Sequence, residues 1–180
     1  KYGDNLTEIR HTVAFVNEYQ KPISGFEEGR IYNGYRFVYP LKYNDKYLGS
    51  VETSVSMESI MNDLKKELSS ELSFIIKKSV VDNTVFEEEK DNYVQCSIND
   101  DFYHEKSISK DENEIMGTII KEYFEKNPTQ AKNNLKSGEI FNFYSFYKNN
   151  YYITTYLPLK NIVSNQTVAY IIILNEHNDL

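Results

Sequence analysis

The order of apolar and polar positions predicts that groups of strands alternate with helices along the chain. Apolar residues at helical spacing predict a first helix over residues 6–20, and Pro22 ends it because proline lacks the amide hydrogen that a helix needs. Two segments rich in aromatic and β-branched residues, 34–43 and 47–55, are separated by a short polar turn at 44–46. This pattern is typical of a β-hairpin.

The pattern after the hairpin predicts helices placed around one further strand. Ser56 can cap a helix with one apolar face, and a strand over residues 72–76 follows it. Residues 80–110 are mostly polar and acidic, so we expect a long excursion with only short elements. Two more helices are predicted beyond it, the first capped by Asp111 with Glu114 and ended by Pro128, the second over residues 129–137.

The end of the chain predicts three strands, over residues 140–147, 151–157 and 167–174, with Asn149 and Asn150 in the first turn. Strands therefore cluster in two groups with helices between them. This arrangement favours an α+β fold with a mostly antiparallel sheet over alternating β-α-β winding.

The size of the chain predicts one domain that folds without disulfides. Its 180 residues are 40% hydrophobic, enough for an ordinary core, and Cys96 is the one cysteine. The net charge of -7 argues against a nucleic-acid partner. The longest apolar run, 168–174, is too short to span a bilayer, and no signal peptide opens the chain.

No motif of a catalytic or cofactor site is present. The chain lacks a phosphate loop, a dinucleotide-binding glycine run, a nucleophile elbow and paired histidines at metal spacing, so we expect no enzyme activity, cofactor or metal. The acidic loop 99–105 could bind a cation, but a solvated loop is the favoured interpretation. Cys96 could act as a nucleophile only with a base such as His104, and a buried, inert thiol is favoured.

Alternation along the first hairpin sorts its side chains onto two faces. A three-residue turn places Tyr39 on an aromatic face and Arg36 on the other face, opposite Ser54 and diagonal to Glu52. The guanidinium could then bind a ligand carboxylate or form a structural ion pair with Glu52. The pattern leaves both interpretations open.

The second hairpin has no polar face. One of its faces carries aromatic and hydroxyl side chains together: Phe143, Ser145, Tyr147, Tyr152, Thr154 and Tyr156. A side that faces water should carry a polar row, so both sides of this hairpin are expected to contact a helix, a subunit or a ligand cavity. Aromatic walls with a few hydroxyl groups are typical of small-molecule pockets, and equally of a tyrosine-rich core.

The first third of the chain resembles a known family. The resemblance is carried by residues 2–6, Arg10, Val13, Val16, Asn17, Pro22, 25–30, 33–41, 48–52, Ser54 and Ser56. They are similar to the extracytoplasmic sensory domains of the Cache superfamily, which occur in bacterial chemoreceptors, sensor histidine kinases and diguanylate cyclases. The match is specific over residues 2–60 and holds in outline beyond them.

The resemblance implies a PAS-like core, in which helices flank a central, mostly antiparallel sheet. It implies a single Cache-like domain over residues 1–180, with an N-terminal helix over 1–21 and the core over 22–180. Similar sequences carry a further segment before the position of Lys1, so we expect this chain to be a trimmed sensory region.

The resemblance also implies a function. It implies a periplasmic or extracellular domain that binds a small molecule on its sheet, as in chemotaxis, and that signals as a homodimer anchored in the membrane through segments outside this chain. The match itself names no ligand. From chemistry and position, a ligand that bears a carboxylate is expected to bind at Arg30, Arg36, Tyr39, Glu52, Phe143 and Tyr156.

Two alternatives remain open at this point. The aromatic hairpins could serve association with a second copy or a protein partner without any small ligand, because tyrosine suits an interface as well as a pocket. A hydrolase with a dispersed active site is the third hypothesis, and no motif favours it.

Overall fold

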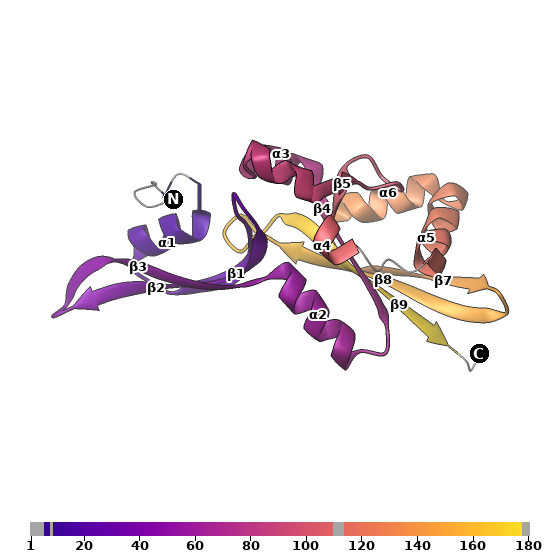
Figure 1. Cartoon of the computed structure of the whole chain (residues 1–180), viewed down its shortest axis with the longest axis horizontal. Coiled ribbons are helices and arrows are strands. Elements are labelled where there is room, and N and C mark those ends of the chain that lie inside the picture. The colour runs from indigo at the N-terminus through magenta and orange to yellow at the C-terminus, as the bar shows by residue number, and fades with distance from the viewer. Residues whose placement is uncertain (1–5, 8, 110–113, 178–180) are drawn as a thin grey trace.

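The computed structural model describes residues 6–7, 9–109 and 114–177, so the expected cap at Asp111 lies outside it. The fold is α+β, as the sequence predicts, with two antiparallel sheets and helices packed around them (Figure 1). In chain order the elements are α1 (His11–Tyr19), β1 (Ile23–Glu28), β2 (Asn33–Tyr43), β3 (Lys46–Ser56), α2 (Met57–Glu67), β4 (Glu71–Lys77), α3 (Lys78–Thr84), the 3-10 helix η1 (Glu87–Asn92), β5 (Tyr93–Gln95), β6 (Phe102–Glu105), α4 (Lys106–Ser109), α5 (Glu114–Lys126), α6 (Pro128–Ser137), β7 (Phe141–Tyr147), β8 (Asn150–Lys160) and β9 (Thr167–His177).

Strands β1, β2 and β3 form a small sheet on which α1 packs. The β2–β3 hairpin pairs Arg36 with Ser54, which confirms the predicted register. The turn itself holds two residues, Asn44 and Asp45, at φ of 48° and 59°. A β-bulge after Leu41 shifts the pairing by one residue. On the side of the bulge away from the turn, the two strands therefore pair in the register that a three-residue turn would produce.

The larger sheet has six strands in the order β5-β6-β4-β9-β8-β7, and all neighbours are antiparallel. The three predicted C-terminal strands are confirmed. The polar segment that was predicted to hold only short elements contains two strands of the larger sheet. Strands β5 and β6 extend this sheet beyond β4. Buried residues alternate in β6, where Phe102 and His104 are buried, and this short period-two pattern is weak in sequence.

Helices cover both faces of the larger sheet (Figure 1). On one face Met57 and Met61 of α2 pack against Leu72 and Phe74 of β4. On the other face α5 and α6 pack against an aromatic surface of β7, β8 and β9. A ligand could therefore bind to this sheet only where the covering helices leave a cavity.

The β7–β8 turn lies one residue before its predicted position. Lys148 and Asn149 form it, at φ of 48° and 66°, in place of Asn149 and Asn150. The strand pairing consequently slips by two residues. Because side chains alternate with a period of two, this slip leaves the predicted faces unchanged.

Candidate functional site

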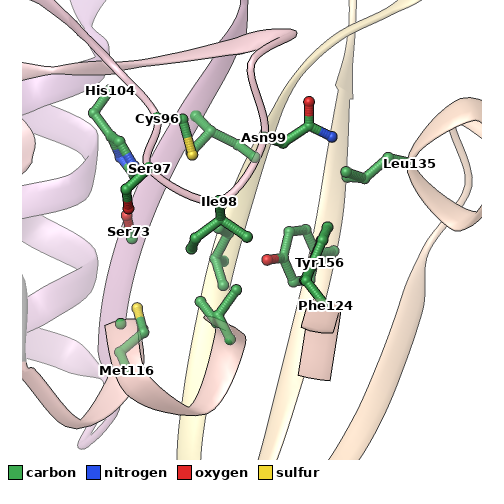
Figure 2. A pocket seen from close by; sticks show the side chains of 14 residues that line it. Ser73, Cys96, Ser97, Ile98, Asn99, His104, Met116, Phe124, Leu135 and Tyr156 are labelled. Carbon is green, nitrogen blue, oxygen red and sulfur yellow. The ribbon is translucent and has the colours of Figure 1, made fainter. Parts of the chain in front are cut away.

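A cavity lies between the six-stranded sheet and helix α5 (Figure 2). The space open to the centre of a water molecule is about 50 Å³. A single water needs roughly 10–15 Å³ by the same measure. The cavity therefore has room for a molecule of a few heavy atoms.

The sheet forms the floor of the cavity and the two helices cover it. Ile75, Tyr156 and Ile172 come from β4, β8 and β9, and Tyr156 pairs directly with Ile172 across the sheet. Helix α5 contributes side chains at a spacing of four residues, which places them on one face, and α6 adds one more. These side chains are Met116, Ile120, Phe124 and Leu135.

The Tyr156 side chain points its hydroxyl into the cavity (Figure 2). The residue is 1% exposed, and no described residue forms a hydrogen bond with this hydroxyl. Burial, and then the charges of Cys96 and Tyr123, raise the pKa of Tyr156 well above its ordinary value. The phenol is therefore neutral and can donate a hydrogen bond to a ligand.

The loop between β5 and β6 forms another wall of the cavity, with Cys96 at its start and His104 just beyond its end. Both side chains are buried. Burial raises the pKa of the Cys96 thiol, but hydrogen bonds with His104 and with the backbone of Ile98 and Asn99, together with the charge of His104, outweigh it and lower the pKa. The structure thus places the Cys96 thiol next to His104, the base that the sequence suggested for it.

Of the six residues expected to bind a ligand, only Tyr156 lines this cavity. Phe143 belongs to the same buried cluster, but its ring stacks on Tyr123 with 3.7 Å between ring centroids. Phe143 therefore supports the aromatic floor beside the cavity, and its contact with a ligand stays a prediction.

Arg36 and Glu52 lie in the small sheet and form the structural ion pair that the sequence allowed, with Nη1 3.1 Å from Oε1. The pair continues through Arg10, which binds Glu52 at 2.5 Å and Glu27 at 2.8 Å. Arg36 also donates to the Tyr32 carbonyl oxygen. These contacts stabilise the packing of α1 on the sheet, and ligand binding by Arg36 and Glu52 stays a prediction.

Arg30 and Tyr39 lie elsewhere. Arg30 lines a second, wider hollow of about 760 Å³ between β1, α3 and the β8–β9 loop, and its guanidinium lies over the Phe86 ring at 4.8 Å. Tyr39 is 47% exposed on the open face of β2. Neither residue is near the cavity lining, and their binding of a ligand also stays a prediction.

Buried carboxyl groups meet where the two sheets join. Tyr93 of β5 donates to Glu28 Oε1 at 3.2 Å, and Asn33 of β2 donates to Glu105 of β6. Burial, and then the charge of Glu105, raise the pKa of Glu28 to about 8, although the Tyr93 hydrogen bond and the charge of Arg36 oppose this rise. Glu28 is therefore protonated at neutral pH.

The candidate cation loop over residues 99–105 does not gather its side chains. His104 lines the cavity, whereas Glu105, its neighbour on the strand, binds Asn33 and Ser107. In the described part of the chain no three His, Cys, Asp or Glu side chains lie close enough to hold a metal ion. No helix within the described ranges is both long and apolar enough to cross a membrane.

The sequence did not predict that the β5–β6 loop lines the cavity. Its residues Cys96 to Asn99 fall in a polar stretch without a strong pattern, and Ser73 sits within an apolar strand. The one available signal in the sequence is the pair Cys96 and His104, a thiol and a candidate base eight residues apart. Only the pairing of β6 with β4 brings that pair onto the aromatic sheet.

The comparison with protein families identifies a sensory family. Residues 1–177 match the family dCache_3, the double sensory domain of two-component sensor kinases. Two similar solved structures are the ligand-binding domain of the Pseudomonas fluorescens chemoreceptor CtaA with L-serine and with L-isoleucine. Their identities are both 12%, their TM-scores are 0.41 and 0.39, and the alignments cover 99% of this chain and 65% and 61% of those chains.

The chain thus spans less than two thirds of the length of these chemoreceptor domains. No curated protein sequence matches it. The family match covers almost every residue of the chain and agrees with the resemblance seen in the first third of the sequence. The chain belongs to the dCache_3 family of double sensory domains.

Proposed function

We propose that this chain is the extracytoplasmic ligand-sensing domain of a membrane-anchored bacterial signalling receptor, built as a single Cache-like domain over residues 1–180. A small molecule binds in the cavity between α5 and the six-stranded sheet and changes the conformation that is passed across the membrane. The observation that carries this proposal is the Tyr156 hydroxyl, which is buried, faces the cavity and has no partner among the described residues. A ligand in the cavity would give this hydroxyl a hydrogen-bond partner.

The cavity lining restricts the chemistry of this ligand. Among the described residues, no Asp, Glu, Lys or Arg side chain lines the cavity, and the polar side chains of the lining are Ser73, Ser97, Asn99, His104 and Tyr156. The ligand is therefore small and largely apolar, with one or two polar groups. If it bears a carboxylate, the group lies beside His104, which is the one side chain of the described lining that can become a cation.

Replacing Tyr156 with phenylalanine should weaken ligand binding about fivefold, because one hydrogen bond of roughly 1 kcal/mol is lost. The stability of the ligand-free protein should stay within about 0.5 kcal/mol, since no protein contact of the hydroxyl is removed. A thermal-shift screen of small carboxylates, amino acids and amines identifies a ligand, and titration of both proteins with it gives the two affinities.

Tyr170→Phe is the matched control. This buried tyrosine on the same sheet face donates to the Leu135 carbonyl oxygen at 2.9 Å, so its loss should cost about 1 kcal/mol of stability and leave the affinity unchanged. An equal affinity of Tyr156→Phe and the unmodified protein would contradict the proposed place of the ligand.

One observation favours the alternative function, association without a small ligand. The open face of the β2–β3 hairpin exposes several large apolar side chains: Tyr35, Tyr39, Leu41, Tyr43, Val51 and Val55. Exposed apolar surface of this kind marks contact sites. If this face joins two copies of the chain, Tyr39→Lys should convert a dimer to a monomer in analytical ultracentrifugation. A monomeric unmodified protein at high concentration would refute the alternative.

A further inference from the structure

We propose that Cys96 is a modification site, at which a small hydroperoxide oxidises the thiol to a sulfenic acid inside the cavity. The proposal uses the cavity described above, but it goes beyond reversible ligand binding and does not require it. Three observations carry it: the hydrogen bonds to the Cys96 sulfur, the position of the sulfur in the cavity, and the Tyr156 hydroxyl that points into the same space.

The surroundings of the sulfur favour a thiolate. The backbone N–H groups of Ile98 and Asn99 donate to the sulfur, and His104 forms a further hydrogen bond with it. Backbone amides and an imidazolium stabilise a negative charge, so the pKa of Cys96 falls although burial opposes this. The thiolate is the nucleophilic form of cysteine.

Within the part of the lining that the structure describes, the titratable side chains beside Cys96 are His104 of β6 and Tyr156 of β8. The lining residues of β4, β9, α5 and α6 carry no ionisable group. The charge state of the thiol is therefore set by its pairing with His104. Tyr156 lies close enough that the charge of Cys96 raises its pKa, which keeps the phenol neutral and able to donate.

Access to the sulfur is limited by size. Cys96 is 3% exposed and can be reached through a cavity of about 50 Å³. A peroxide of a few heavy atoms fits this space, whereas a peptide disulfide does not. The unpartnered Tyr156 hydroxyl can donate a hydrogen bond to a peroxide oxygen within the cavity.

The reaction balances without a further reagent. The thiolate attacks one oxygen of the hydroperoxide, so that a sulfur–oxygen bond forms and the oxygen–oxygen bond breaks. Sulfur is oxidised by two electrons and the peroxide is reduced by two. The leaving hydroxide or alkoxide takes the proton that His104 holds, which gives water or an alcohol and leaves Cys96 as the sulfenic acid.

The product should be long-lived within the chain. Cys96 is the one cysteine of the sequence, so no second thiol of this chain can convert the sulfenic acid into an intrachain disulfide. The new oxygen lies in the cavity that faces α5. Oxidation would thus act on the same helix and sheet as a bound ligand.

The test is oxidation of the purified, folded protein by hydrogen peroxide at pH 7. Samples are then unfolded in denaturant that contains dimedone, so that the trap reaches any sulfenic acid, and intact mass is the readout. We expect one dimedone adduct per chain, and none in Cys96→Ser, which also corrects for methionine oxidation. An ordinary thiol is only a few per cent ionised at pH 7, and the pKa of Cys96 is lowered, so the rate per thiol should exceed that of N-acetylcysteine. Glutathione disulfide should react more slowly with Cys96 than with N-acetylcysteine.

His104→Asn should lower the peroxide rate toward that of N-acetylcysteine. A direct measurement on the unmodified protein guards against a variant that does not fold: the ultraviolet absorbance of the thiolate should titrate below the ordinary pKa of a cysteine thiol. No adduct after oxidation of the folded protein and trapping in denaturant, a rate no higher than that of N-acetylcysteine, or a thiolate titration at or above that ordinary value would overturn the proposal.

Failure of this proposal can be told apart from failure of the proposed function. A ligand that shifts the melting temperature of Cys96→Ser as it does that of the unmodified protein supports the function independently of the thiol. Adduct formation in a protein that responds to no ligand supports the thiol chemistry alone.

Discussion

Replacing Glu27 with alanine should destabilise the protein by about 3–5 kcal/mol, the cost of leaving a buried charge without its partner. Glu27 is 2% exposed and accepts from Arg10 Nε at 2.8 Å and from the Thr12 hydroxyl and amide at 2.7 and 3.0 Å. Without Glu27, the two guanidiniums of Arg10 and Arg36 would share Glu52 alone. The amide of Thr12, in the first turn of α1, would also lose its acceptor.

Chemical denaturation at neutral pH measures this effect. Asp63→Ala is the matched control, because Asp63 pairs with Lys66 at 3.0 Å while both side chains are exposed. Such a helix-surface pair contributes roughly 0.3–0.5 kcal/mol. Hydrogen exchange should report earlier opening of α1 in Glu27→Ala, and equal destabilisation by the two variants would show that the ion network does not hold the helix.

Raising the pH from about 5 to about 8 should weaken the protein, and Glu28→Gln should remove much of that loss. The pKa of Glu28 rises from its ordinary 4.5 to about 8, mainly through burial and then through the charge of Glu105. Between these two values the folded protein keeps a proton that the unfolded chain has released. Stability is therefore fully present below the ordinary pKa, falls as pH rises through the window, and levels off above the folded pKa.

The expected loss from Glu28 is of the order of a few kcal/mol, since each pKa unit corresponds to about 1.4 kcal/mol. The pKa of Glu105 is also raised, chiefly by burial, so Glu105 acts in the same direction in both proteins. The difference between the two profiles therefore isolates Glu28. Melting temperatures measured from pH 5 to pH 9 decide the matter, and parallel profiles would mean that Glu28 is ionised in the folded protein.

These two predictions share a structural origin at the small sheet. Glu27 and Glu28 are adjacent on β1, yet one carboxylate is paired with a guanidinium and the other has an unpartnered Oε2. The difference comes from the neighbours, because Glu27 meets Arg10 while Glu28 meets Tyr93 at the edge of the larger sheet. Protonation of Glu28 is thus a feature of the contact between the two sheets.

Local sequence patterns predicted the two hairpins and the faces on which their side chains lie. The β2–β3 register came from alternation, and it holds although the turn and the bulge differ from the expected three-residue turn. The β7–β8 turn was misplaced by one residue, yet Phe143 and Tyr156 still share the buried face. A period of two tolerates such errors, because only an odd slip exchanges the two faces.

Local sequence patterns could not predict contacts between residues that lie far apart in the chain. The contacts of Arg10, Glu27 and Glu28 were not predicted, because each residue pairs with a group far along the chain, as the contact of Arg10 with Glu52 shows. The strand β6 was missed because it has four residues, and its stability comes from pairing with β4 and β5. Tertiary context decides such elements more than intrinsic preference does.

The sequence by itself determined the fold class, the aromatic face of the last hairpin and the Cache resemblance, since each depends on neighbours along one strand or on a run of residues. Only the tertiary structure decided that the cavity lies under α5, that Tyr156 faces it and that Cys96 meets His104 beside it. The physical reason is that a cavity is the space left after distant elements pack. No single segment carries the information about how closely its partners approach.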